Sequence, residues 1–404
     1  MVFYRVLCVF LILVLVDYGR CEALNGGRVA CYVLRTSYMP LTALPGAGRV
    51  CTHITVAFAE INGITLATPS STEVEFYNAI TKLKATNPSL SVLISLQRDF
   101  SGVIQASDQK KQSFAVALSD YVKKYNFDGA DFDWEPSHAV TPTERQGYMK
   151  LLQIIRHTFD NDTTFLGSPP RQMSAALIPS IPRSKTLYDV PVLAKVLDFA
   201  TAMTYDYHSY RNKPNTTTGY NSPLYAPSGE RKDYCTDGTI RNYIALGMPS
   251  SKLLLGLPTY GRTYTLGAAA IHGLHAPAID KGKAGPVRGI RGLYTYQDAC
   301  IVVKGSTRVW DDKSMVPYLY NQTTWASYDN IESSIIKCLY VINNKLGGAG
   351  IWALHLDDYN GMCGQGLFPL VDAVGSCLKQ GRSLYLKYQS QSNRMANKDK
   401  FGFA

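Results

Sequence analysis

The sequence predicts an α/β protein built as a closed (β/α)8 barrel, or TIM barrel, with a small α+β insertion. Two observations support this fold class. Short runs of Val, Ile and Leu, separated by Gly and Pro, alternate with helical patterns along most of the 404-residue chain. One connection, of about ninety residues, is far longer than an ordinary loop. A mixed open sheet is the alternative, but it would need a different account of the acidic strand described below.

Eight apolar runs are expected to form the barrel strands. They are Arg28–Val33, Thr52–Ala59, Ser91–Leu96, Phe127–Trp134, Gln172–Ile178, Leu197–Thr204, Lys252–Leu257 and Ala349–Leu354. Helical patterns fill most of the gaps, such as Val74–Thr86, Lys110–Tyr125, Thr143–Phe159 and Ser334–Lys345. Strands that alternate with helices in this way are typical of a parallel barrel.

The long connection lies between the seventh and eighth expected strands and is rich in Gly, Tyr and Val. Its own β-like runs are Thr263–Leu266, Gly292–Tyr296 and Val316–Tyr320. We therefore expect residues 24–262 and 329–378 to form the barrel. Residues 263–328 are expected to form the insertion, between the seventh strand and the following helix, and to wall one side of the barrel mouth.

The N-terminus has the layout of a secretory signal peptide. Arg5 precedes an apolar run, Val6–Val16, that is too short to span a membrane. Cys21 and Ala23 give a site of the small-x-small type, so residues 1–23 are expected to be cleaved off. No later stretch is apolar and long enough to cross a bilayer. These features predict a secreted, extracellular protein.

Cysteine usage also fits an oxidising compartment. Removal of residues 1–23 takes away Cys8 and Cys21, so seven of the nine cysteines remain, an odd number. Most of these are expected to pair, and one is left over. N-glycosylation sequons begin at Asn161, Asn215 and Asn321.

The formal net charge of +10 would suit nucleic acid, anionic membranes or acidic glycans as partners. However, Lys and Arg are scattered and form no basic helix, so we expect neither a nucleic-acid nor a membrane partner. Residues 379–404 are basic and rich in Ser, Gln and Asn, which is typical of a disordered tail. His208 and His355 lack partners at ligand spacing, so no metal site and no cofactor is expected.

The segment Phe127–Glu135 predicts a chemical site. Asp131, Asp133 and Glu135 alternate with apolar residues, so on a strand all three carboxylates share one face. Helical patterns on both sides of the segment predict a barrel strand that is buried on both faces. An acid facing such an interior costs on the order of several kcal/mol unless it is paired, protonated or used. A solvated acidic strand is the alternative, and the helical flanks argue against it.

The same segment carries the pattern Asp-Gly-x-Asp-x-Asp-x-Glu at residues 128–135. This pattern resembles the fourth-strand motif of glycoside hydrolase family 18, the chitinases and chitinase-like proteins. Supporting similarities follow in the order that the family uses, at residues 29–32, 51–59, 203–206, 221–225, 257–262 and 347–358. The resemblance covers nearly the whole mature chain. It implies a TIM barrel that acts as a monomer on chitin or chitooligosaccharides.

The resemblance implies a substrate-assisted mechanism, in which the 2-acetamido oxygen of the sugar attacks the anomeric carbon. Glu135 would be the general acid and then the base. Asp133 would hold the acetamido N–H, and Asp131 would share a proton with Asp133 because neighbouring carboxylates do not all ionise cheaply. Tyr205 would donate a hydrogen bond to the acetamido oxygen.

Substrate-binding residues are also implied by the resemblance. Trp352 would form the floor under the reacting sugar, and Asp206 would support the bound sugar. The other substrate-binding residues implied by the matched motifs are Tyr32, Phe58, Met203, Tyr260 and Arg262.

Disulfide pairing follows in part from the resemblance. The implied pairs are Cys31–Cys51 and Cys300–Cys363. The three other cysteines have no obvious counterpart in the family. A pair between Cys338 and Cys377 would link adjacent outer helices and leave Cys235 free.

Four positions depart from the family pattern. Thr36 and Asp99 stand where the family usually presents tryptophans, Pro136 directly follows Glu135, and His355 stands where Asp is frequent. A groove with fewer aromatic side chains is expected to bind long chitin weakly. The leading hypothesis is a secreted chitinase that acts by substrate-assisted retention, and the alternative is a chitinase-like lectin without turnover. Glu135 favours the enzyme, because lectin-like members usually lose this acid.

Overall fold

The computed structural model describes residues 27–35, 38–97, 100–162, 170–211, 213, 216–381, 383–384 and 386–387. The expected signal peptide, residues 1–23, and most of the expected tail lie outside the described residues. Thr36, Asp99 and the sequon residue Asn215 lie outside them as well.

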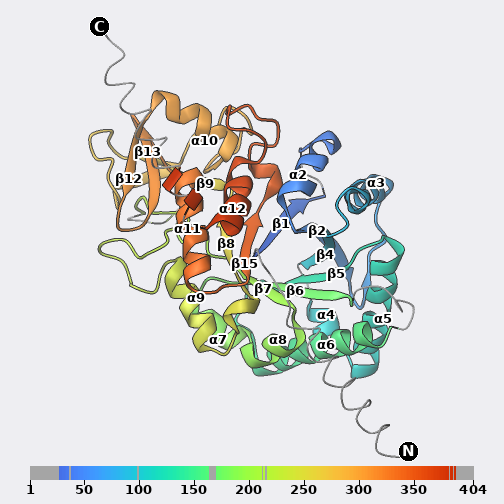
Figure 1. The fold of residues 1–404 in the computed structure, drawn as a ribbon. Helices are drawn as coiled ribbons and strands as arrows, with labels where there is room; N and C mark the ends of the chain where they lie inside the picture. Colours follow the sequence, from blue (N-terminus) through green and yellow to red (C-terminus); the bar gives the residue numbers. More distant parts are fainter. Residues whose placement is uncertain are drawn as a thin grey trace, which may run out of the picture.

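Parallel strands close into a barrel, which confirms the predicted (β/α)8 fold (Figure 1). Their order is β1-β15-β8-β7-β6-β5-β4-β2, and β1 pairs with β2 to complete the ring. The bounds are β1 Arg28–Leu34, β2 His53–Asn62, β4 Ser91–Gln97, β5 Gly129–Asp133, β6 Gln172–Leu177, β7 Phe199–Ala202, β8 Leu253–Pro258 and β15 Gly348–Trp352. A two-residue strand, β3 (Thr65–Leu66), pairs antiparallel with the end of β2.

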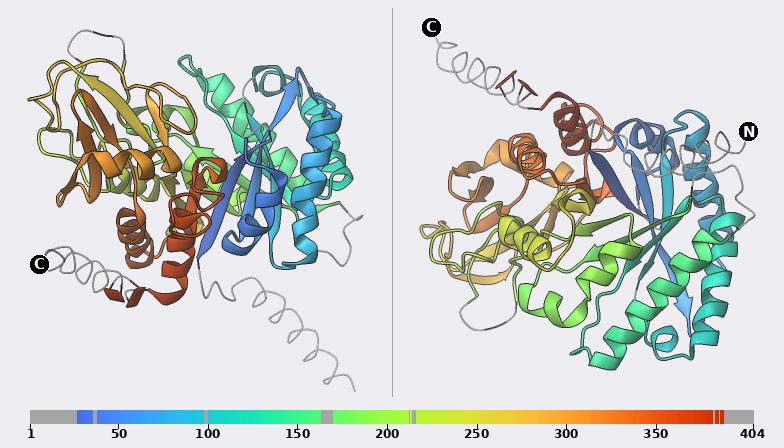
Figure 2. Two further views of the ribbon diagram at one scale, coloured as in Figure 1. Left: turned by 90° about the horizontal axis from the view of Figure 1, so that it is seen from above. Right: turned by 60° about the horizontal axis from the view of Figure 1, so that its bottom comes forward.

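Helices cover the outside of the barrel (Figures 1 and 2). Their bounds are α2 Leu44–Val50, α3 Ser71–Thr81, α4 Ser101–Ile104, α5 Asp108–Lys124, α6 Pro142–Asp160, α7 Ile181–Leu187, α8 Val190–Val196, α9 Thr236–Ala245, α11 Ile331–Asn343 and α12 Pro369–Gln380. Short 3₁₀ helices occupy Leu41–Ala43, Lys82–Ala85, Ser250–Lys252, Val303–Gly305 and Leu354–Leu356. Helix α12 therefore includes Lys379 and Gln380, the first residues of the segment predicted as tail.

Between β8 and α11 the chain forms an antiparallel six-stranded sheet beside the barrel (Figure 2). The strand order is β10-β9-β14-β13-β12, and β11 also pairs with β9. The bounds are β9 Tyr260–Leu266, β10 Ala278–Lys281, β11 Leu293–Thr295, α10 Tyr296–Val302, β12 Thr307–Asp311, β13 Val316–Asn321 and β14 Thr324–Ser327. Only Thr259 separates β8 from β9, so this sheet begins before residue 263, the boundary expected from the sequence.

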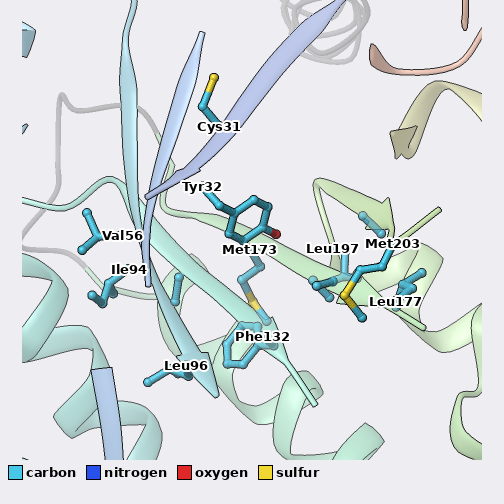
Figure 3. Packing of buried hydrophobic residues seen from close by; sticks show 14 of the residues in the cluster. Cys31, Tyr32, Val56, Ile94, Leu96, Phe132, Met173, Leu177, Leu197 and Met203 are labelled. Carbon is cyan, nitrogen blue, oxygen red and sulfur yellow. The ribbon is translucent and has the colours of Figure 1, made fainter. Parts of the chain in front are cut away.

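Hydrophobic side chains fill the space between the barrel strands and their helices, and Figure 3 shows part of this core. Val56, Ile94, Leu96, Phe132 and Met173 come from the four strands β2, β4, β5 and β6 and are all inaccessible to solvent. The insertion sheet has a smaller core of its own. This second core contains Tyr220, Tyr264, Leu266 and Trp325.

Helix α3 begins earlier than its apolar pattern predicts, at Ser71 and not at Val74. A capping box explains the difference. The Ser70 side chain accepts the Glu73 N–H, and the Glu73 carboxylate accepts the Ser70 N–H. These two bonds satisfy N–H groups that a helix start leaves free, so the helix includes polar residues ahead of the apolar pattern.

Strand β7 is shorter than the predicted strand Leu197–Thr204. Beyond Ala202 the N–H groups of Thr204 and Tyr205 bond to carbonyl groups only two residues back in the chain. The backbone therefore leaves the parallel ladder at this point, and Tyr205 lies past the strand at the barrel mouth.

Disulfides join segments that are far apart in the sequence. The pairs are Cys31–Cys51, Cys300–Cys363 and Cys338–Cys377. The first links β1 to the segment before β2, the second links α10 to the loop after β15, and the third links α11 to α12. These are the pairs named from the sequence, and Cys235 carries a buried free thiol.

Two of the predicted sequons are on the described surface. Asn161 is exposed at the end of α6, and Asn321 is exposed at the end of β13. Within the described ranges, no helix combines the length and the apolar character needed to cross a membrane.

Helix α5 offers a test of the core. Leu118 is fully buried, whereas Val116, on the same helix, is 47% exposed. We expect Leu118→Ala to lower the free energy of unfolding by about 2–5 kcal/mol, since it removes buried methyl groups and leaves a cavity. The control Val116→Ala should stay within about 0.5 kcal/mol of wild type. Urea unfolding measures both, and equal losses would contradict the packing described here.

Candidate active site

Strand β5 carries two of the predicted carboxylates into the barrel interior. Asp131 and Asp133 are 0% and 4% exposed. The strand ends at Asp133, so Glu135 lies beyond it and is exposed. The predicted strand Phe127–Trp134 was therefore too long, and Glu135 is not one of its alternating residues. This correction places the last carboxyl group at the mouth, where a ligand could reach it.

Asp131 is held by three hydroxyl groups. Its Oδ1 accepts hydrogen bonds from Ser174 at 2.6 Å and Tyr32 at 3.1 Å, and its Oδ2 accepts one from Ser95 at 2.7 Å. Ser95 and Ser174 pair with Asp131 in the ladders of β4 and β6, while Tyr32 reaches across from β1. Burial raises the pKa of Asp131, and the three hydrogen bonds oppose this shift by stabilising the carboxylate.

Asp133 has a less complete set of partners. Its Oδ2 accepts a hydrogen bond from Gln97 Nε2 at 3.2 Å, and its buried Oδ1 has no hydrogen-bond partner in the described part of the chain. Burial raises the pKa of Asp133 well above its usual value, and the charges of Glu135 and Asp131 raise it further. The environment thus favours a protonated Asp133. The proton shared between Asp131 and Asp133 stays a prediction, since each acid bonds to other groups.

Glu135 lies at the outer end of this series of acids. Loss of surrounding water raises its pKa, and the negative charge of Asp206 adds to the increase. Hydrogen bonding with Asp133 and Gln97 and the positive charge of Arg183 oppose it. Arg183, on α7, also donates a hydrogen bond to the carbonyl group of Pro136, the residue after Glu135. A carboxyl group with a raised pKa at an accessible mouth keeps its proton to a higher pH than an ordinary Glu and can donate it to a ligand.

Aromatic rings cover the barrel interior beside these acids. Trp352, the last residue of β15, has its ring centroid 5.7 Å from that of Tyr32 and 5.9 Å from that of Phe58. Trp352 and Phe58 are partly exposed, whereas Tyr32 is buried and bonds to Asp131. Met203, which is 7% exposed, belongs to the barrel core. Trp352 and Phe58 thus offer an apolar floor on which the C–H face of a sugar could stack.

A polar wall lies on the side of the insertion. Asp206 Oδ1 accepts hydrogen bonds from Tyr260 at 2.8 Å and from Arg262 Nε at 2.7 Å, and the Arg262 guanidinium lies 5.2 Å from the Tyr260 ring centroid. Tyr205 packs edge-on against Tyr260, with ring centroids 6.1 Å apart. Burial raises the pKa of Tyr205 well above its usual value, and Asp133 and Glu135 raise it further. Tyr205 therefore keeps its proton and can act as a donor.

Two hollows lie near this end of the barrel, and one of them is lined by an acid of the motif. One, of about 350 Å³, is lined by residues that include Phe58 and Gln97. The other, of about 290 Å³, is lined by residues that include Trp134, Glu135 and His138. The structure thus brings the predicted catalytic residues to one end of the barrel, where Glu135 lines an open hollow.

Several contributing residues were missed in the sequence. Ser95, Gln97 and Ser174 bond to the acids, and Arg183 acts on Glu135. Ser95 and Gln97 lie two residues apart on β4 and so face the same side of the strand. Polar residues at this spacing in an apolar strand could have indicated hydrogen-bond partners for the acids. Arg183 comes from a different barrel unit, and no local pattern links it to Glu135.

The histidines show no metal chemistry. In the described ranges, no group of three or more His, Cys, Asp and Glu residues is arranged to hold a metal ion. His355 is 5% exposed, and burial together with the charge of Arg288 lowers its pKa to about 4. His355 is therefore neutral and buried, and it contributes to packing near the barrel mouth.

Comparison with known proteins agrees with this geometry. The sequence profile of glycosyl hydrolases family 18 matches residues 28–357, and the chain belongs to this family. Mouse chitotriosidase-1 is 32% identical over 380 residues, which cover 89% of this chain and 78% of the relative. An immunomodulatory active chitinase from Trichuris suis superposes with a TM-score of 0.80 at 29% identity, over 87% of this chain and 100% of that chain.

A further solved structure is that of a human pseudo-chitinase with retained chitooligosaccharide binding. It has a TM-score of 0.80 and 29% identity, over 87% of this chain and 99% of that chain. Because active and pseudo-chitinases share the fold, catalysis has to be argued from the residues of the site.

The contact between Arg183 and the Glu135 segment gives a test that needs no substrate. We expect Arg183→Gln to raise the pKa of Glu135, because a positive charge that stabilises the carboxylate is lost. Arg183→Lys keeps the charge and should leave the pKa nearer to wild type. Carbon NMR titration of the Glu135 carboxyl group measures both variants. An unchanged pKa in Arg183→Gln would show that Arg183 does not act on this acid.

Proposed function

We propose that this protein is a secreted chitinase, which hydrolyses β-1,4 linkages between N-acetylglucosamine units with retention of configuration. The observation that carries the proposal is the placement of Glu135 at the mouth, next to a buried Asp133 with a free oxygen. The similarity to chitotriosidase-1 and to an active chitinase supports an enzyme.

Glu135 serves as the general acid. Its raised pKa keeps the carboxyl group protonated at a higher pH than an ordinary Glu, so it can protonate the glycosidic oxygen as the bond to the anomeric carbon breaks. In the second step the same group, now a carboxylate, takes a proton from the attacking water. The accessible position of Glu135 beside an open hollow supports this role.

The substrate supplies the nucleophile. Its 2-acetamido oxygen attacks the anomeric carbon and forms an oxazolinium ring, which water later opens. The free Oδ1 of Asp133 accepts the acetamido N–H, and the Tyr205 hydroxyl donates to the acetamido oxygen. Asp131, fixed by its three hydroxyl donors, holds Asp133 in the less ionised state through its negative charge.

Sugar binding uses the floor and the wall. Trp352 stacks on the reacting sugar, with Phe58 beside it, and Met203 contributes an apolar edge. Asp206, Tyr260 and Arg262 form a linked polar wall for the hydroxyl groups of the next sugar. The ligand is chitin or its oligomers, and the enzyme acts as a monomer outside the cell. The disulfides support the extracellular location.

The role of Glu135 is tested by Glu135→Gln. We expect turnover of a fluorogenic chitotriose glycoside to fall by at least about 10²-fold, because the amide has no proton to donate. Oligosaccharide affinity should remain close to wild type. Glu75→Gln, on the exposed face of α3, is a matched control and should keep full activity. Oligosaccharide binding without turnover in the wild-type protein would instead favour a chitinase-like lectin.

The substrate-assisted step predicts the stereochemistry of the product. Hydrolysis should first release the β-anomer and should require the 2-acetamido group, since attack from within the substrate and then by water inverts the anomeric centre twice. Proton NMR of the initial product identifies the anomer. Initial α-anomer, or full activity on β-1,4-glucan oligomers, would rule out this mechanism.

A further inference from the structure

Tyr205 and Asp206 lie in an irregular segment that no strand or helix holds. The Tyr205 ring packs edge-on against Tyr260, and the structure shows no hydrogen-bond partner of its hydroxyl group among the described residues. Asp206 has φ +58°, in the left-handed region that a residue other than glycine seldom adopts. The direction of both side chains therefore depends on how the main chain is held on either side of Tyr205.

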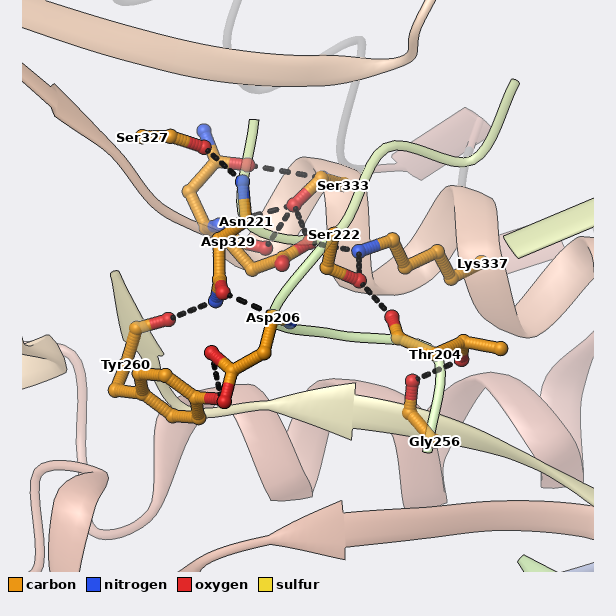
Figure 4. A network of polar contacts seen from close by, with 11 residues as sticks. Thr204, Asp206, Asn221, Ser222, Gly256, Tyr260, Ser327, Asp329, Ser333 and Lys337 are labelled. Carbon is orange, nitrogen blue, oxygen red and sulfur yellow. Dashed lines mark hydrogen bonds and ion pairs between the residues drawn. The ribbon is translucent and has the colours of Figure 1, made fainter. Parts of the chain in front are cut away.

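Asn221 holds the main chain on the far side of Tyr205 (Figure 4). Its side chain is fully buried, and Oδ1 accepts the Asp206 N–H at 3.1 Å. Its Nδ2 donates to the carbonyl oxygen of Tyr260 at 3.0 Å, and its own N–H donates to Ser327 Oγ at 2.9 Å. One amide group thus ties Asp206 to Tyr260, the residue whose hydroxyl bonds to the Asp206 carboxylate.

Ser222, the next residue, holds the near side of Tyr205. Its Oγ donates to the Thr204 carbonyl oxygen at 2.6 Å and accepts a hydrogen bond from Lys337 Nζ at 2.8 Å. Lys337, on α11, is buried and forms a 2.6 Å ion pair with Asp329. The Thr204 side chain in turn donates to the Gly256 carbonyl oxygen at 2.6 Å. Figure 4 shows this series of contacts from α11 to the segment before Tyr205.

We propose that Asn221 and Ser222 act together as positioning residues, which fix the main chain at Thr204 and Asp206 and so direct the Tyr205 hydroxyl and the Asp206 carboxylate. The inference rests on the proposed function for the roles of Tyr205 and Asp206. Asn221 and Ser222, with their hydrogen bonds to the main chain, are called the clamp below. The ion pair of Lys337 and Asp329 anchors the clamp to the outer helix α11, away from the substrate.

The clamp acts on the transition state more than on the ground state. A sugar chain binds over the whole floor and wall, whereas the Tyr205 hydroxyl meets the acetamido oxygen closely only as that oxygen attacks. A small displacement of a positioned donor therefore lowers the rate of the chemical step more than it lowers the affinity for the substrate. The clamp therefore predicts a fall in kcat with little change in KM. Loss of folded enzyme would also lower the apparent kcat, so the folded fraction of each variant is measured alongside the kinetics.

The test compares Ser222→Ala, its conservative variant Ser222→Thr and the control Ser333→Ala. Ser333 belongs to the same network, where its Oγ donates to Asp329 at 2.8 Å, but it does not contact the segment around Tyr205. We expect Ser222→Ala to lower kcat by about tenfold or more, with KM within about threefold. Ser222→Thr should restore most of the rate, and Ser333→Ala should keep it. Asn221→Ala is a second variant with the same expectation.

Thermal unfolding of each variant accompanies the kinetics, which are measured well below the lowest midpoint. Wild-type kcat in Ser222→Ala would overturn the proposal, as would an equal fall in Ser333→Ala. If wild-type protein shows no turnover, the proposed function fails separately. The clamp is then tested by binding of a chitobiose thiazoline, which mimics the cyclic intermediate, against plain chitotetraose. Ser222→Ala should weaken the thiazoline selectively, and equal effects on both ligands would overturn the clamp.

Discussion

Asp131 lies in the barrel interior with hydroxyl groups from β1, β4 and β6 on its two oxygens, and the site is built outward from this buried acid. A carboxyl group in such a position is tolerated because its hydrogen bonds replace the lost water. The donors come from three strands that meet only when the barrel closes. Closure of the sheet and burial of the acid therefore support each other, and Asp133 takes its place along the same strand.

From Asp131 to Glu135 the environment changes from fully enclosed to exposed. The inner acid has three donors, the middle acid bonds to Gln97 and Glu135 and has one oxygen without a partner among the described residues, and the outer acid borders open space. The negative charges of Asp131 and Glu135 both make ionisation of Asp133, which lies between them, less favourable. The three carboxyl groups thereby acquire different protonation behaviour from their burial, their hydrogen-bond partners and their neighbouring charges.

The sequence was sufficient for the fold, because the fold depends on local periodicity. A dense motif supplied the residues that are proposed for the site. The predictions from the sequence were wrong at the ends of elements, where tertiary contacts and caps determine the boundary. Strand β5 stops before Glu135, β7 stops before Tyr205, and α3 gains a turn from the Ser70 cap. The supporting residues Arg183, Asn221 and Lys337 come from separate barrel units. Their contacts depend on how these units pack, and no pattern along the chain encodes that.

Thr259 joins the parts of the mouth to each other. Its N–H donates to the Trp352 carbonyl oxygen at 2.9 Å, and its hydroxyl group bonds to both the N–H and the carbonyl oxygen of Ala353. Tyr260, the next residue, already belongs to the insertion sheet. Thr259 therefore fixes the position of the aromatic floor at Trp352 relative to the polar wall at Tyr260. No flexible linker separates the two at this junction, so a ligand that spans both would bind without the entropy cost of ordering a hinge there.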